Sequence, residues 1–254
     1  MQPLQRGTRK LCERTIETLL PPTSRTPEAA RDCISFIGKA ILLIDLSGWS
    51  ADETLREFIA RTVASHSTQK DQYRISLAFN ARAFEKVAGI KVLWTRDLLS
   101  HLEVGLNDST LALFHNVKIL QLYEQSSLRN IFPDSFLDET RRTLSLMLPV
   151  ADKASVKWFH SKQRRLGLDM AAGECRHLRA TQRNIQDFDF WRDRLIIARE
   201  AFDLSQPRGL VQFWRDDRNK VQWWTFWVAI TVFLLTLIGV VEGALQVYKA
   251  YHPS

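Results

Sequence analysis

One segment near the end of the chain limits what the whole protein can be, because the 21 residues from Val221 to Val241 include no charged side chain. A helix of that length measures roughly 32 Å, which matches the hydrocarbon core of a lipid bilayer. Its few polar side chains are mostly threonines, whose hydroxyl groups can donate to backbone carbonyls one turn earlier. The alternative is a buried core helix of a soluble protein, although such helices seldom continue this long without a charge. The sequence therefore predicts a transmembrane helix over residues 221–241.

Aromatic and basic side chains flank the predicted span in the pattern typical of a membrane–water interface. We expect an interfacial lead-in over residues 207–220 and a short outer tail over residues 242–254. The side chains expected at the interface are Trp214, Arg215, Arg218, Lys220, Trp223, Trp224, Trp227, Tyr248 and Tyr251. In the outer half of the span, Gly239 and Gly243 have the GxxxG spacing that lets two helices approach closely. They are candidates for a helix–helix contact in a homo-oligomer, although glycines near a helix end are also common without this role.

The charges around the span predict its orientation. Arg208, Arg215, Arg218 and Lys220 precede the span, whereas Lys249 is the only lysine or arginine that follows it. The positive-inside rule therefore places the N-terminal side in the cytosol. The first ten residues have no apolar core of the kind found in a signal peptide. We expect a tail-anchored, single-pass protein with its N-terminal part in the cytosol.

The residues before the span have the composition of a folded domain. The chain of 254 residues is 45% hydrophobic and 25% charged, which is typical of globular proteins. We expect a poorly ordered segment over residues 1–26 and a cytosolic body over residues 27–206. The three cysteines are widely spaced and form no disulfide framework, which suits a reducing compartment.

Short hydrophobic patterns and helix-capping residues predict the elements of this body. Strands are expected at residues 90–94 and 110–114, and residues 41–46 are expected to form a strand or a buried segment. Ser50 and Glu53 have the spacing of a capping box, which would open a helix to about residue 64 with Leu55, Phe58, Ile59 and Val63 on its apolar face. Further helices are expected over residues 10–20, from Thr26-Pro27 onwards, and over residues 80–87 with Asn80 as cap, 97–102, 117–123, 135–148 and 184–202. The last two have apolar faces, formed by Leu137, Thr140, Leu144 and Met147 and by Phe188, Trp191, Leu195, Ala198 and Phe202. This alternation predicts an α+β fold that is mostly helical, with a small sheet.

Most of the net charge of +7 lies in the residues that directly precede the predicted span. Residues 151–220 have a formal charge of +5, whereas residues 1–150 have a formal charge of +2. Anionic lipid headgroups attract such a basic region, and each cation near the surface contributes about 1 kcal/mol to the binding free energy. Nucleic acid is the other class of partner that basicity suggests, but both signs of charge are mixed here and no nucleic-acid-binding motif is present. We therefore expect a lipid surface as partner, together with an unidentified protein, and no nucleic acid.

Two histidines and a carboxylate are the first candidates for a catalytic or metal site. His101 and His115 follow the two predicted strands, and Asp97 lies just before His101. These side chains would form a metal site only if the sheet brought them together, and buried structural histidines are the more common case. The sequence has no phosphate-binding loop, no HExxH and no GxSxG motif. We assign no catalytic, cofactor-binding or metal-binding residue.

Three other patterns have structural alternatives that we favour. Asp187 and Asp189 match the DxD of some metal-dependent glycosyltransferases, but acidic residues at a helix start are favourable on electrostatic grounds alone. Cys175 and His177 would point about 200° apart on a helix, so they cannot act together as nucleophile and base. Glu242 follows the span directly, where a carboxylate usually reaches the headgroups.

Two distinctive segments lie in the C-terminal part: the Trp-rich run from Phe213 to Trp227, and Glu-Gly-Ala-Leu-Gln-Val-Tyr-Lys-Ala-Tyr at residues 242–251. In these segments the chain resembles a group of uncharacterised fungal single-pass membrane proteins. Upstream, similar segments are Gly89–Thr95, Asp97–Leu102, Phe114-His115, Glu139–Leu144 and Trp191–Leu195, so that the resemblance covers roughly residues 75–252. Tails of this group have a few more apolar residues before Glu-Gly-Ala, so Glu242 is expected closer to lipid here. The resemblance implies a membrane anchor, and the group has no established activity.

Two classes of function follow from these patterns. The first is a protein-interaction or structural module that a single span holds at a membrane surface. The second is a membrane-bound enzyme without a recognisable catalytic motif, with the region of His101 and His115 as its site. An ion-transport subunit is a weaker third class, because one span must form an oligomer before it lines a pore. The sequence favours the interaction module.

Overall fold

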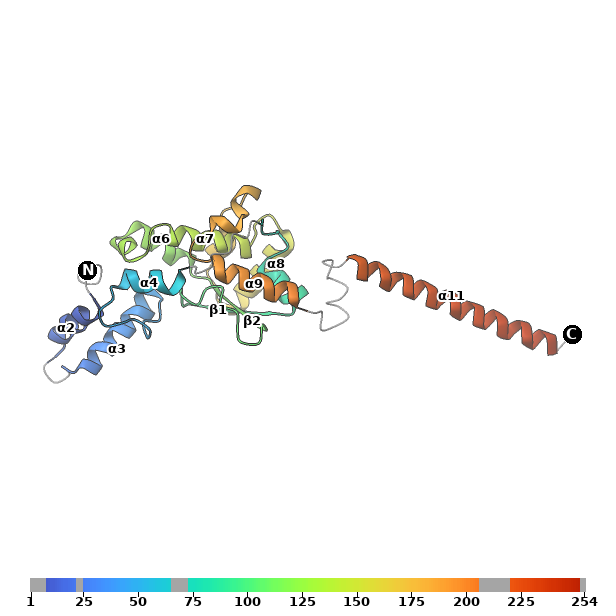
Figure 1. The fold of residues 1–254 in the computed structure, drawn as a ribbon, viewed down its shortest axis with the longest axis horizontal. Helices are drawn as coiled ribbons and strands as arrows, with labels where there is room; N and C mark the ends of the chain where they lie inside the picture. Colours follow the sequence, from blue (N-terminus) through green and yellow to red (C-terminus); the bar gives the residue numbers. More distant parts are fainter. Residues whose placement is uncertain (1–7, 22–24, 65–72, 206–219, 252–254) are drawn as a thin grey trace. The chain divides into compact units, whose positions relative to one another are not determined.

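The computed structural model describes residues 8–21, 25–64, 73–205 and 220–251. The chain divides into two compact units, Met1–Gln206 and Pro207–Ser254, which are considered separately (Figure 1). The first unit, called the body, is mostly helical and contains one two-stranded sheet. In the second unit, the described residues 220–251 form one long helix. The predicted α+β class with one C-terminal helix is therefore confirmed.

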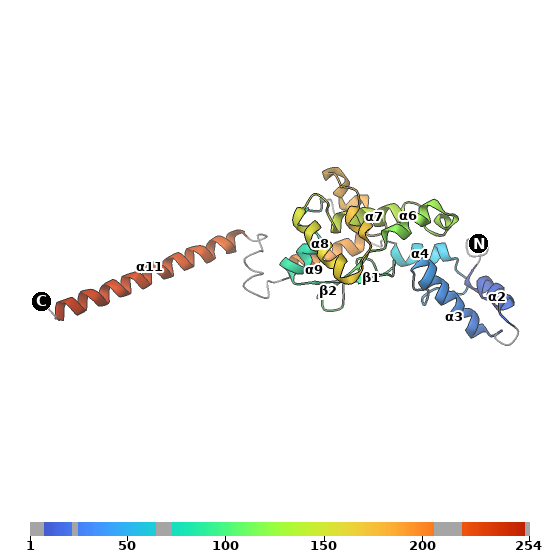
Figure 2. The same ribbon diagram turned by 180° about the vertical axis from the view of Figure 1, so that it is seen from behind.

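The body begins with two helices, α2 (Arg9–Leu19) and α3 (Pro27–Ile37), which pack against each other. Figure 2 shows this pair from behind, beside α4. The helix α2 matches the short helix expected within the N-terminal segment. Thr26 caps α3 as predicted, because its Oγ1 accepts a hydrogen bond of 3.1 Å from the backbone N–H of Ala29.

A buried turn follows α3. The helix continues as a π-helical turn, η2 (Gly38–Leu42), and Leu43 then adopts a left-handed conformation with φ of 52°. A Cβ on Gly38 would lie 2.6 Å from the Leu46 side chain, so only glycine fits at this close approach. Leu42, Leu43, Ile44 and Leu46 are all buried. Of the two alternatives for residues 41–46, the structure shows the buried segment.

The start of α4 (Leu55–Val63) corrects one prediction. The cap is Thr54 and not Ser50: the Thr54 backbone N–H donates to the Glu57 carboxylate at 2.8 Å, and the Glu57 N–H donates to Thr54 Oγ1 at 3.3 Å. Ser50 and Glu53 instead close a separate turn before the helix. The sequence contains two consecutive patterns of the same spacing, Ser50–Glu53 and Thr54–Glu57, and the second, which begins directly before Leu55, forms the cap. The predicted apolar face is confirmed, since Leu55, Phe58, Ile59 and Val63 are buried.

Both predicted strands are present. After α5 (Ala81–Ala83) and the π-helical turn η3 (Phe84–Ala88), Gly89 ends the helix in the left-handed region. The strands β1 (Lys91–Thr95) and β2 (Thr110–Phe114) then pair in parallel, with Lys91 opposite Thr110 and Thr95 opposite Phe114. Asn80 caps α5 as expected, because its Oδ1 accepts a hydrogen bond from the Ala83 N–H at 3.0 Å.

The connection between the strands is not the helix predicted over residues 97–102. This segment forms hydrogen-bonded turns that end at Leu102, where φ is 60°. The backbone N–H of Leu102 donates to Ala112 O, and the Ala112 N–H donates to Glu103 O, both at 2.8 Å. The connection therefore pairs with the free edge of β2, and these tertiary bonds outweigh its local helical pattern.

The remaining elements form the second half of the body. Their bounds are α6 (Val117–Gln125), η4 (Ser127–Ile131), α7 (Phe136–Met147), α8 (Lys153–Leu166), η5 (Met170–Glu174), η6 (Ala180–Arg183), η7 (Ile185–Asp187) and α9 (Arg192–Leu204). The helix α8 has no counterpart among the predicted elements, because it buries only Ser155 and Phe159 and so has a weak apolar pattern. The helix predicted over residues 184–202 begins only at Arg192.

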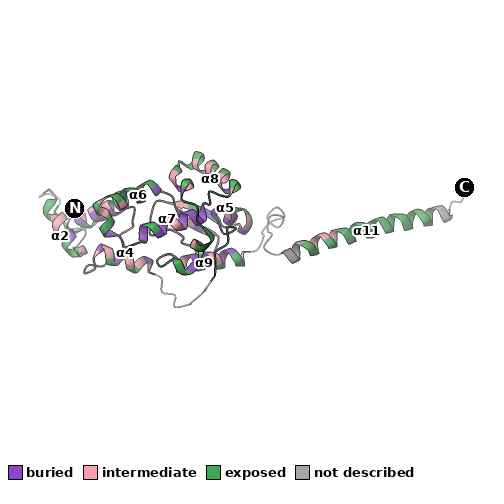
Figure 3. Cartoon of the chain, turned by 90° about the horizontal axis from the view of Figure 1, so that it is seen from above, coloured by how far each residue is buried: buried purple, intermediate pink, exposed green. Residues whose placement is uncertain are grey.

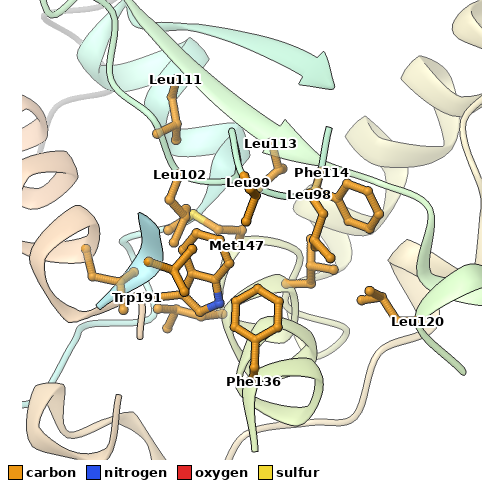
Figure 4. Packing of buried hydrophobic residues seen from close by; sticks show 14 of the residues in the cluster. Leu98, Leu99, Leu102, Leu111, Leu113, Phe114, Leu120, Phe136, Met147 and Trp191 are labelled. Carbon is orange, nitrogen blue, oxygen red and sulfur yellow. The ribbon is translucent and has the colours of Figure 1, made fainter. Parts of the chain in front are cut away.

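The core lies between α7, the sheet and α9. Figure 4 shows the large side chains Phe136, Met147 and Trp191 beside leucines of the sheet and its connection. Phe136 contacts Trp191 with ring centroids 5.5 Å apart, and it stacks on Phe132 at 5.9 Å. In Figure 3 the helices of the body carry buried residues on one side and exposed residues on the other. This is the pattern of amphipathic helices around a single core.

The inner face of α7 also carries polar groups, and these join it to α9. The Glu139 side chain is buried, and its two oxygens accept hydrogen bonds of 2.8–2.9 Å from the backbone N–H groups of Asp189, Phe190 and Trp191. The Trp191 indole donates to Thr140 Oγ1 at 2.9 Å. These bonds fix an irregular turn directly before α9, which explains why the helix begins later than its apolar pattern predicts.

We predict that Glu139→Gln lowers the free energy of unfolding by about 1–3 kcal/mol, the cost of leaving a buried donor without a partner. An amide has only one acceptor oxygen, so at least one of the three N–H groups then faces an NH2 donor. The measurement is denaturant unfolding of the full chain in detergent micelles. The neighbouring exposed Asp138 supplies the control, since Asp138→Asn should change stability by less than about 0.5 kcal/mol. Equal effects of the two substitutions would contradict this role for Glu139.

Candidate functional site

The second unit is a candidate membrane anchor. The helix α11 runs from Lys220 to Tyr251, and its segment Trp224–Tyr248 is 25 residues long and apolar enough to cross a membrane. None of this segment is buried inside the structure, and the colouring of Figure 3 marks nearly all of it as exposed. The segment begins three residues later than the predicted span and continues past it, so that it includes Glu242.

Polar groups within α11 are arranged as a lipid environment requires. Thr231 Oγ1 donates to Trp227 O at 2.9 Å, and Thr236 Oγ1 donates to Val232 O at 2.8 Å. Each hydroxyl thus has an acceptor one turn earlier, as the sequence predicts.

The two glycines of the span leave an open strip on one side of α11. Gly239 and Gly243 are four residues apart and therefore lie on the same face. A Cβ added to either residue would meet no atom within 4 Å, apart from the backbone of the helix itself. Two such glycines give a second helix room for close approach.

Aromatic side chains mark both ends of the apolar segment. Trp224 at its start and Tyr248 at its end are 64% and 63% exposed, and Tyr251 one turn later is 81% exposed. Trp227 is half-buried. Trp214, Arg215 and Arg218 lie outside the described residues, as do the side chains of Lys220 and Trp223. The 24-residue separation of Trp224 and Tyr248 corresponds to roughly 36 Å along a helix, which places one aromatic ring near each interface of a bilayer.

In the body, His101 has a structural environment. Its ring is fully buried, Nδ1 accepts a hydrogen bond from the Phe114 N–H at 3.3 Å, and Nε2 lies 2.7 Å from Thr143 Oγ1. The Thr143 hydroxyl donates to Thr140 O, so its oxygen accepts from His101 and the proton must lie on Nε2. Protonation of the ring would place a second proton on Nδ1, where it would face the backbone N–H of Phe114. Burial, together with the nearby Arg194, lowers the pKa of His101 to about 3.

The other members of the candidate metal site have separate partners. His115 Nδ1 accepts from the Asp169 N–H at 3.4 Å, and burial lowers the pKa of this histidine. The Asp97 carboxylate accepts from the N–H groups of Asp45 and Leu99 and from the Ser100 hydroxyl. Within the described ranges, no three histidine, cysteine or acidic side chains are placed to hold a metal ion.

The DxD pattern and the cysteine–histidine pair also have structural environments. Asp189 lies in the turn held by Glu139, and its carboxylate pairs with Arg192 at 3.4 Å. The Cys175 thiol is buried near Ala171 O at 3.6 Å, whereas His177 is exposed. Burial raises the pKa of Cys175 to about 11, so the thiol stays protonated and is a poor nucleophile.

A cavity of about 360 Å³ beside the outer face of α7 was not predicted from the sequence. Asp138, Arg141, Arg142 and Ser145 of α7 contribute to its wall, and residues 171–182 enclose the opposite side. The spacing of these four residues, i, i+3, i+4 and i+7, indicates one face of a helix. That signal was present in the sequence, but such a polar face is normally solvated, and only the tertiary structure shows that it borders a cavity.

Comparison with known protein families, with characterised proteins and with solved structures finds no match to this chain. The roles proposed below are therefore inferred from the residues and their geometry.

We predict that His101 makes the fold sensitive to acid. Because the folded pKa of about 3 lies below the unfolded value of about 6.5, the unfolded state binds more protons between these pH values. The stabilisation is complete above pH 6.5 and is lost as the pH falls, by up to about 5 kcal/mol in total. The measurement is the free energy of unfolding against pH for the full chain and for His101→Asn. The variant should have a shallower dependence over this window, and equal slopes would contradict the prediction.

Proposed function

We propose that this protein is a tail-anchored, single-pass membrane protein whose N-terminal body lies on the cytosolic side and serves as an interaction module. The single observation that carries the proposal is the 25-residue apolar segment of α11, none of which is buried. Roughly 25 cal/mol of free energy is gained for each Å² of apolar surface removed from water, so a fully exposed helix of this kind requires an apolar environment. A lipid bilayer matches both its length and its composition.

The charge distribution supports the orientation. Four basic residues lie in the twenty positions before the span, against one lysine after it. Basic residues are retained on the cytosolic side of membranes, and they also attract anionic headgroups. We therefore include anionic lipid at the cytosolic surface among the partners.

The arrangement of the body favours interaction over catalysis. The residues with the clearest catalytic patterns, His101, His115, Asp97 and Cys175, are engaged in hydrogen bonds that stabilise the fold. Exposed apolar side chains such as Leu19 and Phe36, which are 79% and 70% exposed, are available for a protein-binding surface. We further propose that Gly239 and Gly243 allow two copies of the span to associate. The likeness to fungal single-pass membrane proteins is in keeping with an anchored body.

The orientation can be tested at Asn107, the acceptor of an Asn-Asp-Ser sequon. Asn107 is exposed in the turn before β2, so a lumenal body would offer it to the glycosylation machinery. We expect no glycan on Asn107 when the full chain is inserted into sealed microsomes. We also expect added protease to digest an N-terminal tag without detergent.

Two controls define the outcome of this experiment. A sequon appended after Ser254 should be glycosylated, which shows that the outer tail is lumenal and that the machinery is active. Asn107→Gln identifies any mobility shift that arises at this site. A glycan on Asn107, or a tag that resists protease, would reverse the proposed orientation.

A further inference from the structure

The cavity beside α7 has an arrangement that suggests a ligand. It lies between α6, the outer face of α7 and the segment that follows η5. Ser145 and Cys175 are buried at its base, whereas Gln121 and Arg176 are exposed at its rim. Its volume of about 360 Å³ falls within the range of small-molecule sites. Most of its lining is polar, which favours a small polar ligand over an apolar one.

The arginines of the cavity hold more N–H donors than the protein uses. A guanidinium group has five N–H donors. Arg141 uses two groups to bind Glu124 at 3.0 Å and Asp138 at 3.4 Å. Arg142 donates to the backbone oxygens of Asp187 and Gln182, at 2.9 and 3.3 Å. These bonds fix both guanidinium groups in place and leave further N–H groups on each.

Arg176 provides the third guanidinium. Among the residues that the structure describes, it has no hydrogen bond and no ion pair, although it lines the cavity. It belongs to the segment after η5, whereas Arg141 and Arg142 belong to α7, so cationic groups border the cavity from two sides.

The carboxylates at the cavity leave many of these N–H donors without an acceptor. Two carboxylates, Asp138 and Glu174, are part of the lining, and one oxygen of Asp138 already accepts from Arg141. Cys175 adds no negative charge, because burial raises the pKa of its thiol to about 11. Glu124, which pairs with Arg141 at 3.0 Å, brings the carboxylates to three, so the charges of the three guanidinium groups are matched overall. The excess is one of N–H donors, and it is greatest at Arg176, whose side chain has no anionic partner among the described residues.

We propose that this cavity binds a phosphate monoester through Arg141 and Arg176. A phosphate presents three acceptor oxygens and a charge of about −1.5 to −2, so it can bridge guanidinium groups on two walls. A carboxylate has two oxygens in one plane and one charge, which suits a single bidentate arginine. The phosphate group can belong to a soluble metabolite or to a lipid headgroup, since the chemistry of recognition is the same.

The test uses the full chain in nanodiscs of phosphatidylcholine, titrated with glycerol 3-phosphate by isothermal calorimetry at low ionic strength. We expect saturable binding with one site per chain, and at least a tenfold loss of affinity in Arg176→Gln. This variant removes an exposed side chain without a partner in the described residues, so the fold should remain intact. Arg165→Gln is the matched control, because Arg165 is an exposed arginine on α8 outside the cavity and its loss changes the net charge equally.

Nanodiscs that contain phosphatidic acid, whose headgroup is a phosphate monoester, distinguish the two sources. The headgroup occupies the cavity if nanodiscs with phosphatidic acid suppress the binding of glycerol 3-phosphate to the wild type. The control is an unrelated soluble protein that binds glycerol 3-phosphate, whose binding the same nanodiscs should leave unchanged. If binding to the wild type is unchanged, the ligand is a soluble phosphate ester.

Three results would overturn the proposal. The first is no saturable binding of glycerol 3-phosphate in phosphatidylcholine nanodiscs. The second is an equal effect of Arg176→Gln and Arg165→Gln, which would indicate general attraction to a basic protein. The third is equally tight binding of citrate, which would exclude selectivity for phosphate.

Discussion

The buried carboxylate of Glu139 holds the body together at the point where distant parts of the sequence meet. It joins the first turn of α7 to the turn before α9, about fifty residues later, through three backbone N–H groups. Burial raises the pKa of Glu139, and these three hydrogen bonds act in the opposite direction by stabilising the ionised form. Thr143 on the same face accepts from His101 and so connects α7 to the edge of β2. The position of the turn, the start of α9 and the environment of His101 all depend on this polar face within the core.

The same helix organises the cavity on its other side. The Arg142 guanidinium holds the backbone of η6 and η7 and lies 4.8 Å from the centroid of the Phe188 ring. Arg141, one residue earlier, points its charge toward Glu124 and Asp138. The helix α7 therefore separates a buried polar network inside the body from a charged cavity at its surface. Arg141 is already held by two carboxylates, and a group that is fixed in this way loses little entropy on binding a ligand.

Local signals in the sequence were sufficient for part of this structure. The strands β1 and β2, the caps Thr26 and Asn80, and the apolar faces of α4 and α7 follow from residues that are close in sequence. The errors arise where a distant partner decides the conformation. Residues 97–102 have a helical pattern but bind the edge of β2. Residues 184–191 belong to the predicted helix, but the last three of them bind Glu139 through their N–H groups instead. The capping box at Thr54 differs from that at Ser50 in its distance from the apolar residues, and α8 is a mostly polar helix that buries only Ser155 and Phe159.

The long helix α11 was predictable because a bilayer imposes a length and a composition that need no tertiary partner. The most direct test of its role is alkaline extraction of membranes that contain the full chain or a chain without residues 221–254. If α11 alone anchors the protein, the full chain stays in the membrane pellet at high pH and the truncated chain appears in the supernatant. A truncated chain that remains in the pellet, or a full chain that is released, would contradict the assignment of α11 as the anchor.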